Sequence, residues 1–208
     1  MPNYQLNIVF DTDDLQTIKA AEEKVTLMKK TNKGKPLAWV AFLPFQNNTV
    51  AWEEDYALYA SKVTTQSGAT IYKLSDVDAS PMVSYPFQDY GAFGIPVQDS
   101  SIKKGQYKVV NNYQDEAFLT FGLAQGVQVN GTAFPNRPIN ASIVPREHDA
   151  TFIPLTEVVI FLDSQVTSGM VITEVSSPQT PLIFGGDVTE ITVKYDSNSG
   201  LFIQQQPQ

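Results

Sequence analysis

The residues best suited to chemistry form an acidic turn, Glu53-Glu54-Asp55, between Trp52 and Tyr56. Paired carboxylates beside an aromatic platform are typical of glycosidases and carbohydrate-binding proteins. Because neighbouring side chains of a strand point to opposite faces, Glu53 and Glu54 would face one cleft only if a bulge intervened. An acidic strand end that discourages edge-to-edge pairing is the simpler interpretation. A weak metal site that uses one or two of these oxygens is an alternative.

The single histidine, His148, lies in a charged turn at residues 146–149. One histidine excludes zinc or iron sites built from several histidines of this chain. With Asp149 it could supply half of a hydrolytic triad, but no GxSxG elbow provides the serine. A solvated turn is therefore the favoured interpretation, and we predict no catalytic residue. The candidate metal ligands are Glu53, Glu54, His148 and Asp149.

Composition excludes several other classes of function. The chain has no cysteine, which removes disulfides, thiolate catalysis and cysteine-based zinc sites. No P-loop, strand-linked GxGxxG or HExxH motif occurs. The net charge of −8 argues against a nucleic-acid partner. The one basic cluster, Lys29-Lys30 with Lys33 and Lys35, is interpreted as a solvated strand end and turn.

The ends and hydropathy of the chain predict its location. No apolar run approaches the roughly 18 residues of a membrane helix, so we expect no membrane span. The sequence enters a strand pattern at once, without the basic and apolar regions of a signal peptide. These features, together with the lack of cysteine, predict a cytoplasmic protein.

Short alternating segments separated by turn residues predict an all-β sandwich or barrel. The first strand is expected at Tyr4–Phe10, where Leu6 and Ile8 share one face. One short helix is expected at residues 13–22, with the DTDD segment before it as its N-terminal cap. A calcium loop is the alternative for DTDD, although the glycine and distal glutamate of an EF-hand are missing.

The remaining strands follow from alternation and turns. They are expected at residues 25–30, 36–44, 50–52, 56–60, 69–74, 107–111, 117–123, 127–130, 138–144 and 190–196. Residues 75–105 are expected to form the last strand of the first half and an ordered crossover. Residues 204–206 are expected to be a polar tail that joins no core.

An internal repeat organises the chain. Residues 47–75 recur in altered form at residues 149–176, so that Leu58 corresponds to Ile160 and Ile71 to Ile172. We therefore predict an antiparallel β-sandwich of two halves related by a pseudo-twofold axis. The first β repeat with its crossover is expected at 1–104 and the second repeat at 105–208, as one compact unit sharing a core. Chance similarity between alternating strands is the alternative.

Differences between the two repeats indicate where a site would lie. Both tryptophans belong to the first repeat, which predicts an asymmetric pocket built mainly on that repeat. The differing positions are the pairs Trp39/Ala141, Trp52/Pro154, Phe45/Glu147 and Gln46/His148. The predicted ligand-binding residues are Trp52, Tyr56, Tyr59, Phe45, Trp39 and, at the rim, Arg146.

Two segments carry a resemblance to known proteins: NYQLNIVFDTDDLQTIKAAEEKVTLMKK and AWVAFLPFQNNTVAWEEDYALYAS. They resemble small β proteins of basidiomycete fungi, a set that includes the pink chromoprotein of oyster-mushroom fruiting bodies. The resemblance extends over essentially the whole chain. It implies a non-enzymatic β protein that holds a small aromatic, indolone-type chromophore, with or without a divalent metal ion. It assigns no binding residue to a numbered position.

Two functions are therefore carried forward. The first is a non-enzymatic protein that binds a small aromatic ligand or chromophore, because such pockets are mostly apolar with a few placed polar groups. The alternative is a lectin-like or membrane-active defence protein; a glycosidase or esterase has the least support. A homodimer is expected only because dimers are common and edge strands are available.

Overall fold

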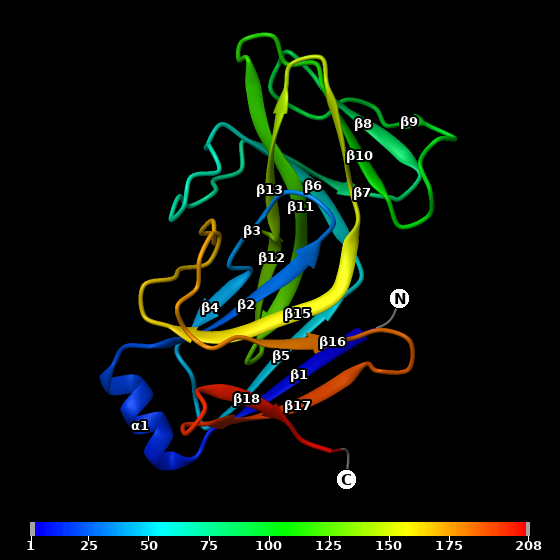
Figure 1. The fold of residues 1–208 in the computed structure, drawn as a ribbon. Helices are drawn as coiled ribbons and strands as arrows, with labels where there is room; N and C mark the ends of the chain where they lie inside the picture. Colours follow the sequence, from blue (N-terminus) through cyan, green and yellow to red (C-terminus); the bar gives the residue numbers. More distant parts are fainter. Residues whose placement is uncertain (1–2, 207–208) are drawn as a thin grey trace.

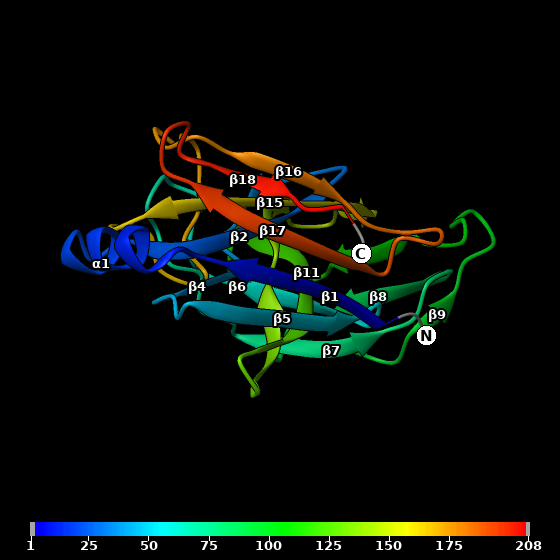
Figure 2. The same cartoon turned by 90° about the horizontal axis from the view of Figure 1, so that it is seen from below.

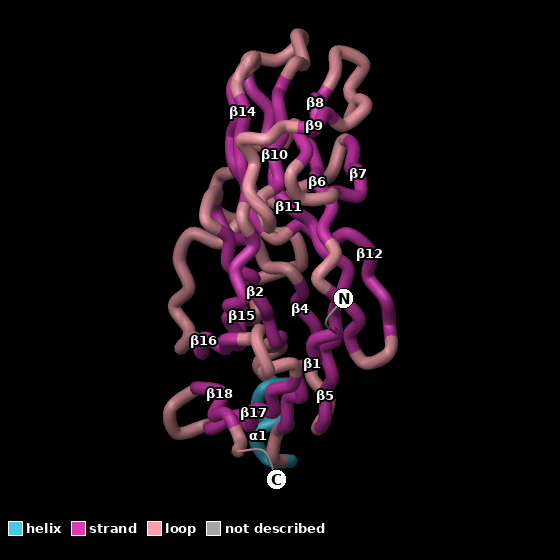
Figure 3. Tube along the Cα trace, turned by 90° about the vertical axis from the view of Figure 1, so that its right-hand side faces the viewer, coloured by secondary structure: helices cyan, strands magenta, loops and turns pink. Residues whose placement is uncertain are grey.

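The computed structural model describes residues 3–206, which are mostly β with one helix and several sheets. The first half of the chain contains β1 (Asn3–Val9), α1 (Thr12–Ala20), β2 (Lys24–Thr31), β3 (Lys35–Pro36), β4 (Val40–Phe42), β5 (Asn47–Glu53), β6 (Tyr56–Ser61), β7 (Ser75–Ala79), β8 (Val83–Phe87) and β9 (Val97–Gln98). The second half contains β10 (Tyr107–Asn111), β11 (Phe118–Val129), β12 (Thr132–Pro138), β13 (Asn140–Pro145), β14 (Asp149–Phe152), β15 (Pro154–Asp163), β16 (Thr180–Ile183), β17 (Glu190–Asp196) and β18 (Leu201–Gln204). The molecule is elongated, with α1 at the end opposite β8 and β9 (Figures 1 and 3).

Three groups of hydrogen-bonded strands make up the fold. The largest runs in the order β18-β17-β1-β5-β11-β13-β3, with β12, β6 and β7 attached through β11 and β6. Two four-stranded sheets have the orders β14-β10-β8-β9 and β16-β15-β2-β4. Seen from below, β16 and β18 lie on one side of the molecule and β5 and β7 on the other (Figure 2).

Four antiparallel strand pairings within the first half of the chain resemble four within the second half. In the first half β1 pairs with β5, β2 with β4, β6 with β7 and β8 with β9, all antiparallel. In the second half β10 pairs with β14, β11 with β13, β15 with β16 and β17 with β18, also antiparallel. Helix α1 has no counterpart between β10 and β11. Strand β3, between β2 and β4, pairs with β13, whereas β12, between β11 and β13, pairs with β11.

Pairings between the halves are also matched. Strand β2 pairs antiparallel with β15, and β11 pairs antiparallel with β6. Strand β1 pairs parallel with β17, and β10 pairs parallel with β8. Each half therefore supplies strands to sheets that the other half completes, and both contribute to one core.

Residues 69–74 do not form the predicted strand. They lie against residues 169–172 instead, where the Gly68 amide donates to the Val171 carbonyl (3.0 Å) and the Ile71 amide to the Gly169 carbonyl (2.9 Å). Gly68 and Gly169 both have positive φ, 77° and 84°, a conformation that suits glycine. The prediction is wrong because it placed residues 69–74 in a hairpin with the preceding strand at residues 56–60. In the structure that strand, β6, pairs with β7 instead.

Other elements were predicted more closely. The helix spans Thr12–Ala20, and Asp13 and Asp14 in its first turn complement the helix dipole. Asp11 occupies the cap position but makes no side-chain cap hydrogen bond; its carboxylate instead pairs with Lys194 at 2.9 Å.

Three strand boundaries were wrong. The predicted strand at residues 36–44 is divided into β3 and β4, and residues 127–130 belong largely to the long β11 rather than to a separate strand. Gln204 of the expected polar tail pairs with Val193 in the β17–β18 ladder. Phe202, two residues earlier, is buried, so this end of the chain does join the core.

Aromatic contacts join the faces of the sheets. Trp39, between β3 and β4, meets Trp52 of β5 edge to face at 5.5 Å. At the other end, Phe87 of β8 meets Phe121 of β11 at 5.5 Å. Burying one such side chain contributes on the order of 1.5–3 kcal/mol, so these contacts fix the sheets against each other. Within residues 3–206, no helix has the length and apolar character needed to span a membrane.

Candidate ligand-binding cleft

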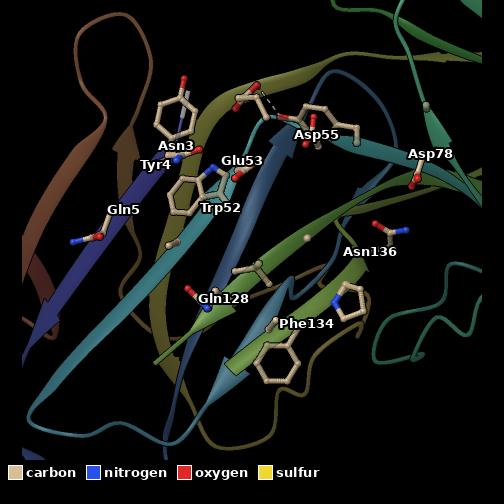
Figure 4. A pocket seen from close by; sticks show the side chains of 18 of the residues that line it. Asn3, Tyr4, Gln5, Trp52, Glu53, Asp55, Asp78, Gln128, Phe134 and Asn136 are labelled. Atoms are coloured by element: carbon tan, nitrogen blue, oxygen red, sulfur yellow. Dashed lines mark hydrogen bonds between the residues drawn. The ribbon is translucent and has the colours of Figure 1, made fainter. Parts of the chain in front are cut away.

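An open cleft of about 1380 Å³ lies beside the ends of β1 and β5. Its walls come from β1, the β5–β6 turn, the end of β7, the start of β10, the β11–β12 pair and the residues just before β17. Figure 4 shows Tyr4 and Trp52 side by side on neighbouring strands, with Gln128 and Phe134 on the strands that follow in the same sheet, β11 and β12. The cleft is wide enough for a drug-sized molecule, whose pockets typically measure about 300–1,000 Å³.

The cleft is acidic. Its lining includes five carboxylates: Glu53, Glu54, Asp55, Asp78 and Glu190. Among the described residues that line it, none is lysine, arginine or histidine. Like charges focused in a concave surface make the local potential negative, which attracts cations and repels anions.

A turn brings three of these carboxylates to one place. Strand β5 ends at Glu53 and β6 begins at Tyr56, so Glu54 and Asp55 belong to the turn between them. Side-chain alternation ends where the strand ends, and all three acids therefore line the cleft. The expectation that only a bulge could achieve this was wrong.

The aromatic wall presents edges rather than free faces. Trp52 is only 4% exposed. Its ring stacks on Tyr4 at 5.7 Å and meets Phe184 at 4.8 Å and Trp39 at 5.5 Å. Tyr56 and Tyr107 lie 5.5 Å apart. A ligand in the cleft would meet ring edges, which carry partial positive charge, and hydroxyl groups.

The tyrosine hydroxyls of this wall are neutral. Burial, with the charge of Glu54, raises the pKa of Tyr107 to about 12. The same two causes raise the pKa of Tyr56 well above its ordinary value. The Tyr56 hydroxyl donates a 3.2 Å hydrogen bond to Glu54 Oε2. Both hydroxyls therefore stay protonated and can act as donors at physiological pH.

Directly behind this wall lies a buried lysine. Lys29 is 2% exposed, and its ammonium group donates a 2.7 Å hydrogen bond to Gln125 Oε1. The Nζ atom lies 5.3, 5.4 and 5.5 Å from the ring centroids of Trp39, Trp52 and Tyr56. It lies 3.9 Å from Glu54 Oε1. Three rings, one amide and one carboxylate thus surround the cation.

The position of Lys29 corrects the interpretation of the basic cluster. Lys29 shares the inward face of β2 with Val25 and Leu27, whereas Lys30 is partly exposed. The available signal was that Lys29 follows Val25 and Leu27 at intervals of two, because alternate residues of a strand share one face. Burial lowers the pKa of Lys29 to about 8, and the charge of Glu54 opposes that shift.

Gln125 links the lysine to the acidic turn. It is fully buried on β11, and its Nε2 donates to the Glu53 carbonyl at 2.5 Å. The backbone carbonyl of Gln125 accepts a 3.2 Å hydrogen bond from Trp39 Nε1. Gln125 belongs to the second half of the chain, so this cluster depends on both halves.

The predicted ligand-binding residues divide into three groups. Trp52 and Tyr56 line the cleft, and Trp39 lies one layer behind them. Tyr59 is in a separate buried cluster, where its hydroxyl donates to the Asn140 carbonyl at 2.6 Å. Phe45, which is 60% exposed, and the exposed Arg146 are not among the lining residues. An aromatic residue at a position where the two repeats differ therefore does not predict whether its side chain lies in the cleft, in the core or on the surface.

The four candidate metal ligands do not form one site. Glu53 and Glu54 line the cleft. Asp149 pairs instead with Lys108 at 3.2 Å, and His148 Nδ1 lies 2.9 Å from the Arg146 carbonyl. In the part of the chain that the structure describes, no three His, Cys, Asp or Glu side chains form a group that could hold a metal ion.

Several lining residues were missed from the sequence. Tyr4 lies on the face of β1 that was assigned to the core. Phe134 and Asn136 belong to β12, for which no strand was predicted at residues 132–137. Asp78 and Glu190 lie far from the acidic turn in sequence and reach the cleft only through the pairings of β7 and β17.

No family model, curated protein or solved structure matches this chain. The resemblance to the basidiomycete proteins therefore stays a prediction.

Proposed function

We propose that this chain is a non-enzymatic binding protein for a small aromatic ligand or chromophore that carries positive charge. One observation carries the proposal: the cleft combines aromatic edges with five carboxylates, and its described lining has no basic residue. The aromatic body of the ligand would lie against the edges of Tyr4, Trp52 and Tyr107. Its cationic group would lie among the carboxylates.

Physical chemistry favours a cation over a neutral or anionic aromatic molecule. An anion would have to approach several carboxylates in a concave site, where like-charge repulsion is strongest. The cleft is large enough for water molecules to bridge the ligand and the carboxylates. A water-mediated hydrogen bond is nearly as favourable in enthalpy as a direct one, so such bridges would weaken binding only slightly.

Binding of three matched two-ring compounds tests the charge preference. N-methylquinolinium is the cation, 2-naphthalenemethanol the neutral compound and 2-naphthoate the anion. Titration calorimetry, followed in parallel by tryptophan fluorescence, is expected to give the tightest binding for the cation and none for the anion. The double variant Glu53→Gln/Asp78→Asn should weaken binding of the cation at least tenfold, whereas the exposed control Glu174→Gln should not. Equal affinity for naphthoate would contradict the proposal.

The native protein gives a second test of the same proposal. A bound chromophore would appear in the visible absorption spectrum and as added mass in native mass spectrometry of protein purified from its source. Denaturation should release that mass if it is held without a covalent bond.

A lectin-like function is the second candidate, because four side-chain amides also line the cleft. They belong to Asn3, Gln5, Gln128 and Asn136. Amides and carboxylates together suit the hydroxyl groups of a sugar. However, sugars usually stack on a free aromatic face, and the face of Trp52 is covered by Tyr4. Glycan-array binding that is lost in Gln128→Ala would favour this alternative, and leakage of lipid vesicles would favour a membrane-active protein.

We also propose that residues 1–104 and 105–208 are two related β repeats around a pseudo-twofold axis. The matched strand pairings within and between the halves support this. Because β2 needs β15 and β11 needs β6, neither half alone should fold. Circular dichroism is expected to report unfolded separate halves and a folded assembly when both are expressed together. A stably folded isolated half would contradict the shared core.

A further inference from the structure

We propose that Lys29 is a covalent attachment point, at which a carbonyl-bearing aromatic ligand in the cleft forms an imine with Nζ. This inference rests on the proposed function of the cleft and narrows its ligand class to aldehydes and ketones.

The surroundings of Lys29 are those of a reactive lysine rather than of a structural ion pair. Its carboxylate neighbour, Glu54, is 3.9 Å away, which is long for a salt bridge, and its one close hydrogen bond is to the neutral Gln125. The remaining space around Nζ is occupied by three aromatic rings. A lysine desolvated in an apolar pocket is the usual activated nucleophile for carbonyl compounds.

Lys29 is one side chain away from the cleft. Of the five groups around Nζ, three also line the cleft: Trp52, Tyr56 and Glu54. The side chain of Glu54 is 29% exposed and lies on a turn. A change of its rotamer toward solvent would open a path to Nζ without moving a strand. The other two groups around Nζ, Trp39 and Gln125, do not line the cleft.

The amine is available at physiological pH. Imine formation requires the neutral amine, and burial lowers the pKa of Lys29 to about 8. At pH 7.4 roughly a fifth of such amines are neutral, against about 0.1% for a lysine with an ordinary pKa near 10.4. The larger neutral fraction favours reaction at Lys29 once a carbonyl ligand occupies the cleft.

The reaction balances without an external oxidant or reductant. The Nζ lone pair forms a bond to the carbonyl carbon, and the carbonyl oxygen leaves as water with the two amine protons. Glu54 is the nearest carboxylate, with Oε1 3.9 Å from Nζ. Uptake of one proton from solvent would convert the neutral imine to its protonated form, for which Glu54 would be the counter-ion. Conjugation of that imine with an aromatic ring would shift its absorption to longer wavelength.

Reductive trapping tests this inference. The probe is 4-formyl-1-methylpyridinium, an aromatic aldehyde with a fixed positive charge, used with cyanoborohydride at pH 7.5 on the intact protein. Chymotryptic peptides are then mapped by mass spectrometry. We expect at least tenfold higher occupancy at Lys29 than at its neighbour Lys30 or any other lysine. The non-carbonyl analogue 1,4-dimethylpyridinium should compete and lower the labelling.

Variants separate chemistry from charge. Lys29→Arg keeps the cation but cannot form an imine, and Lys29→Met removes both; each should abolish the dominant adduct. Lys30→Met is the matched control and should leave it unchanged. Since the primary result is the peptide map of the wild-type protein, the test does not depend on the folding of any variant.

Labelling spread over exposed lysines, with Lys29 unmodified, would overturn the inference. Calorimetry with 1,4-dimethylpyridinium then shows whether the cleft still binds aromatic cations. If it does, the proposed function survives and only the covalent step is wrong; if it does not, both fail.

Discussion

Lys29 on β2 and Leu123 on β11 lie on strands that have matched pairings in the two halves. Lys29 pairs with Val158 of β15, and Leu123 pairs with Leu58 of β6. Both side chains are buried. The same strand arrangement therefore holds an ammonium group in one half and a hydrocarbon in the other.

The difference extends to the neighbours of these residues. Trp39 in the first half corresponds to Ala141 in the second, and Trp39 packs against both Trp52 and Lys29. Leu123 completes the hydrophobic core without a polar neighbour of this kind. A buried cation is tolerated only where rings and polar groups surround it.

Placing a cation in the second half should cost the most. The substitution Leu123→Lys buries an ammonium group without the amide, carboxylate and rings that surround Lys29. We expect the free energy of unfolding to fall by about 3–5 kcal/mol, the range for an uncompensated buried charge. Urea denaturation measures it, and Leu123→Met, a near volume-conserving control, should cost less than about 1.5 kcal/mol. A loss similar to that of the control would show that the surroundings of Lys29 are not special.

Removing the amide beside Lys29 should have the next largest effect. Gln125→Leu leaves the Lys29 ammonium without its close hydrogen-bond acceptor and the Glu53 carbonyl without its donor. We expect a loss of about 2–3 kcal/mol, the cost of unsatisfied buried polar groups. In a double-mutant cycle, Gln125→Leu should cost less once Lys29 is replaced by Met, because no buried charge then remains. Strictly additive losses would contradict a direct Lys29–Gln125 coupling.

The comparison also explains what the sequence could predict. Alternation identified most of the strands, since a half-buried strand repeats every two residues and β1, β10 and β17 each show that pattern. The repeat at 47–75 and 149–176 pointed to the two segments that now lie against each other at Gly68 and Gly169. Partners distant in sequence, such as β7 for β6, depend on tertiary context that alternation does not contain.

The site was harder to predict than the fold. Trp52, Tyr56 and the acidic turn were found because unusual residues lie together in sequence. Lys29 was assigned to solvent, because charge was given more weight than its inward position on β2. Its stabilising partner, Gln125, comes from a strand about a hundred residues away and gives no local signal.

A pH dependence of stability should distinguish the two halves next. The pKa of Lys29 is lowered in the folded protein, to about 8 from its ordinary value of 10.5. Between these values the unfolded chain binds more protons than the folded one, so stability rises as pH increases and is flat below about pH 7. From pH 8 to 9.5 we expect a gain of about 1.5 kcal/mol that Lys29→Met lacks. Urea denaturation of both proteins at each pH cancels the contribution of other groups. Parallel pH curves would place the pKa of Lys29 near its ordinary value.

Above this window the buried tyrosines act in the opposite direction. The pKa values of Tyr56 and Tyr59 are raised by burial, so their stabilising contribution is complete below pH 10 and is lost as pH rises further. The effect of Lys29 on stability must therefore be measured below pH 10. There, of the contributions that Lys29, Tyr56 and Tyr59 make to the free energy of unfolding, only that of Lys29 changes with pH.

The smallest effect on stability should come from Glu54→Gln. The carboxylate is partly exposed and 3.9 Å from Nζ, so we expect a change below about 1 kcal/mol. Its effect on Lys29 should be clearer, because the charge of Glu54 raises the pKa of Lys29 against the effect of burial. Without that charge the pKa should fall further, and NMR titration of the side-chain resonances of Lys29 would detect the shift. The exposed Glu174→Gln serves as the control. An unchanged or higher pKa in Glu54→Gln would mean that the rings and Gln125 alone hold the cation, and that the acidic cleft and the buried lysine act independently.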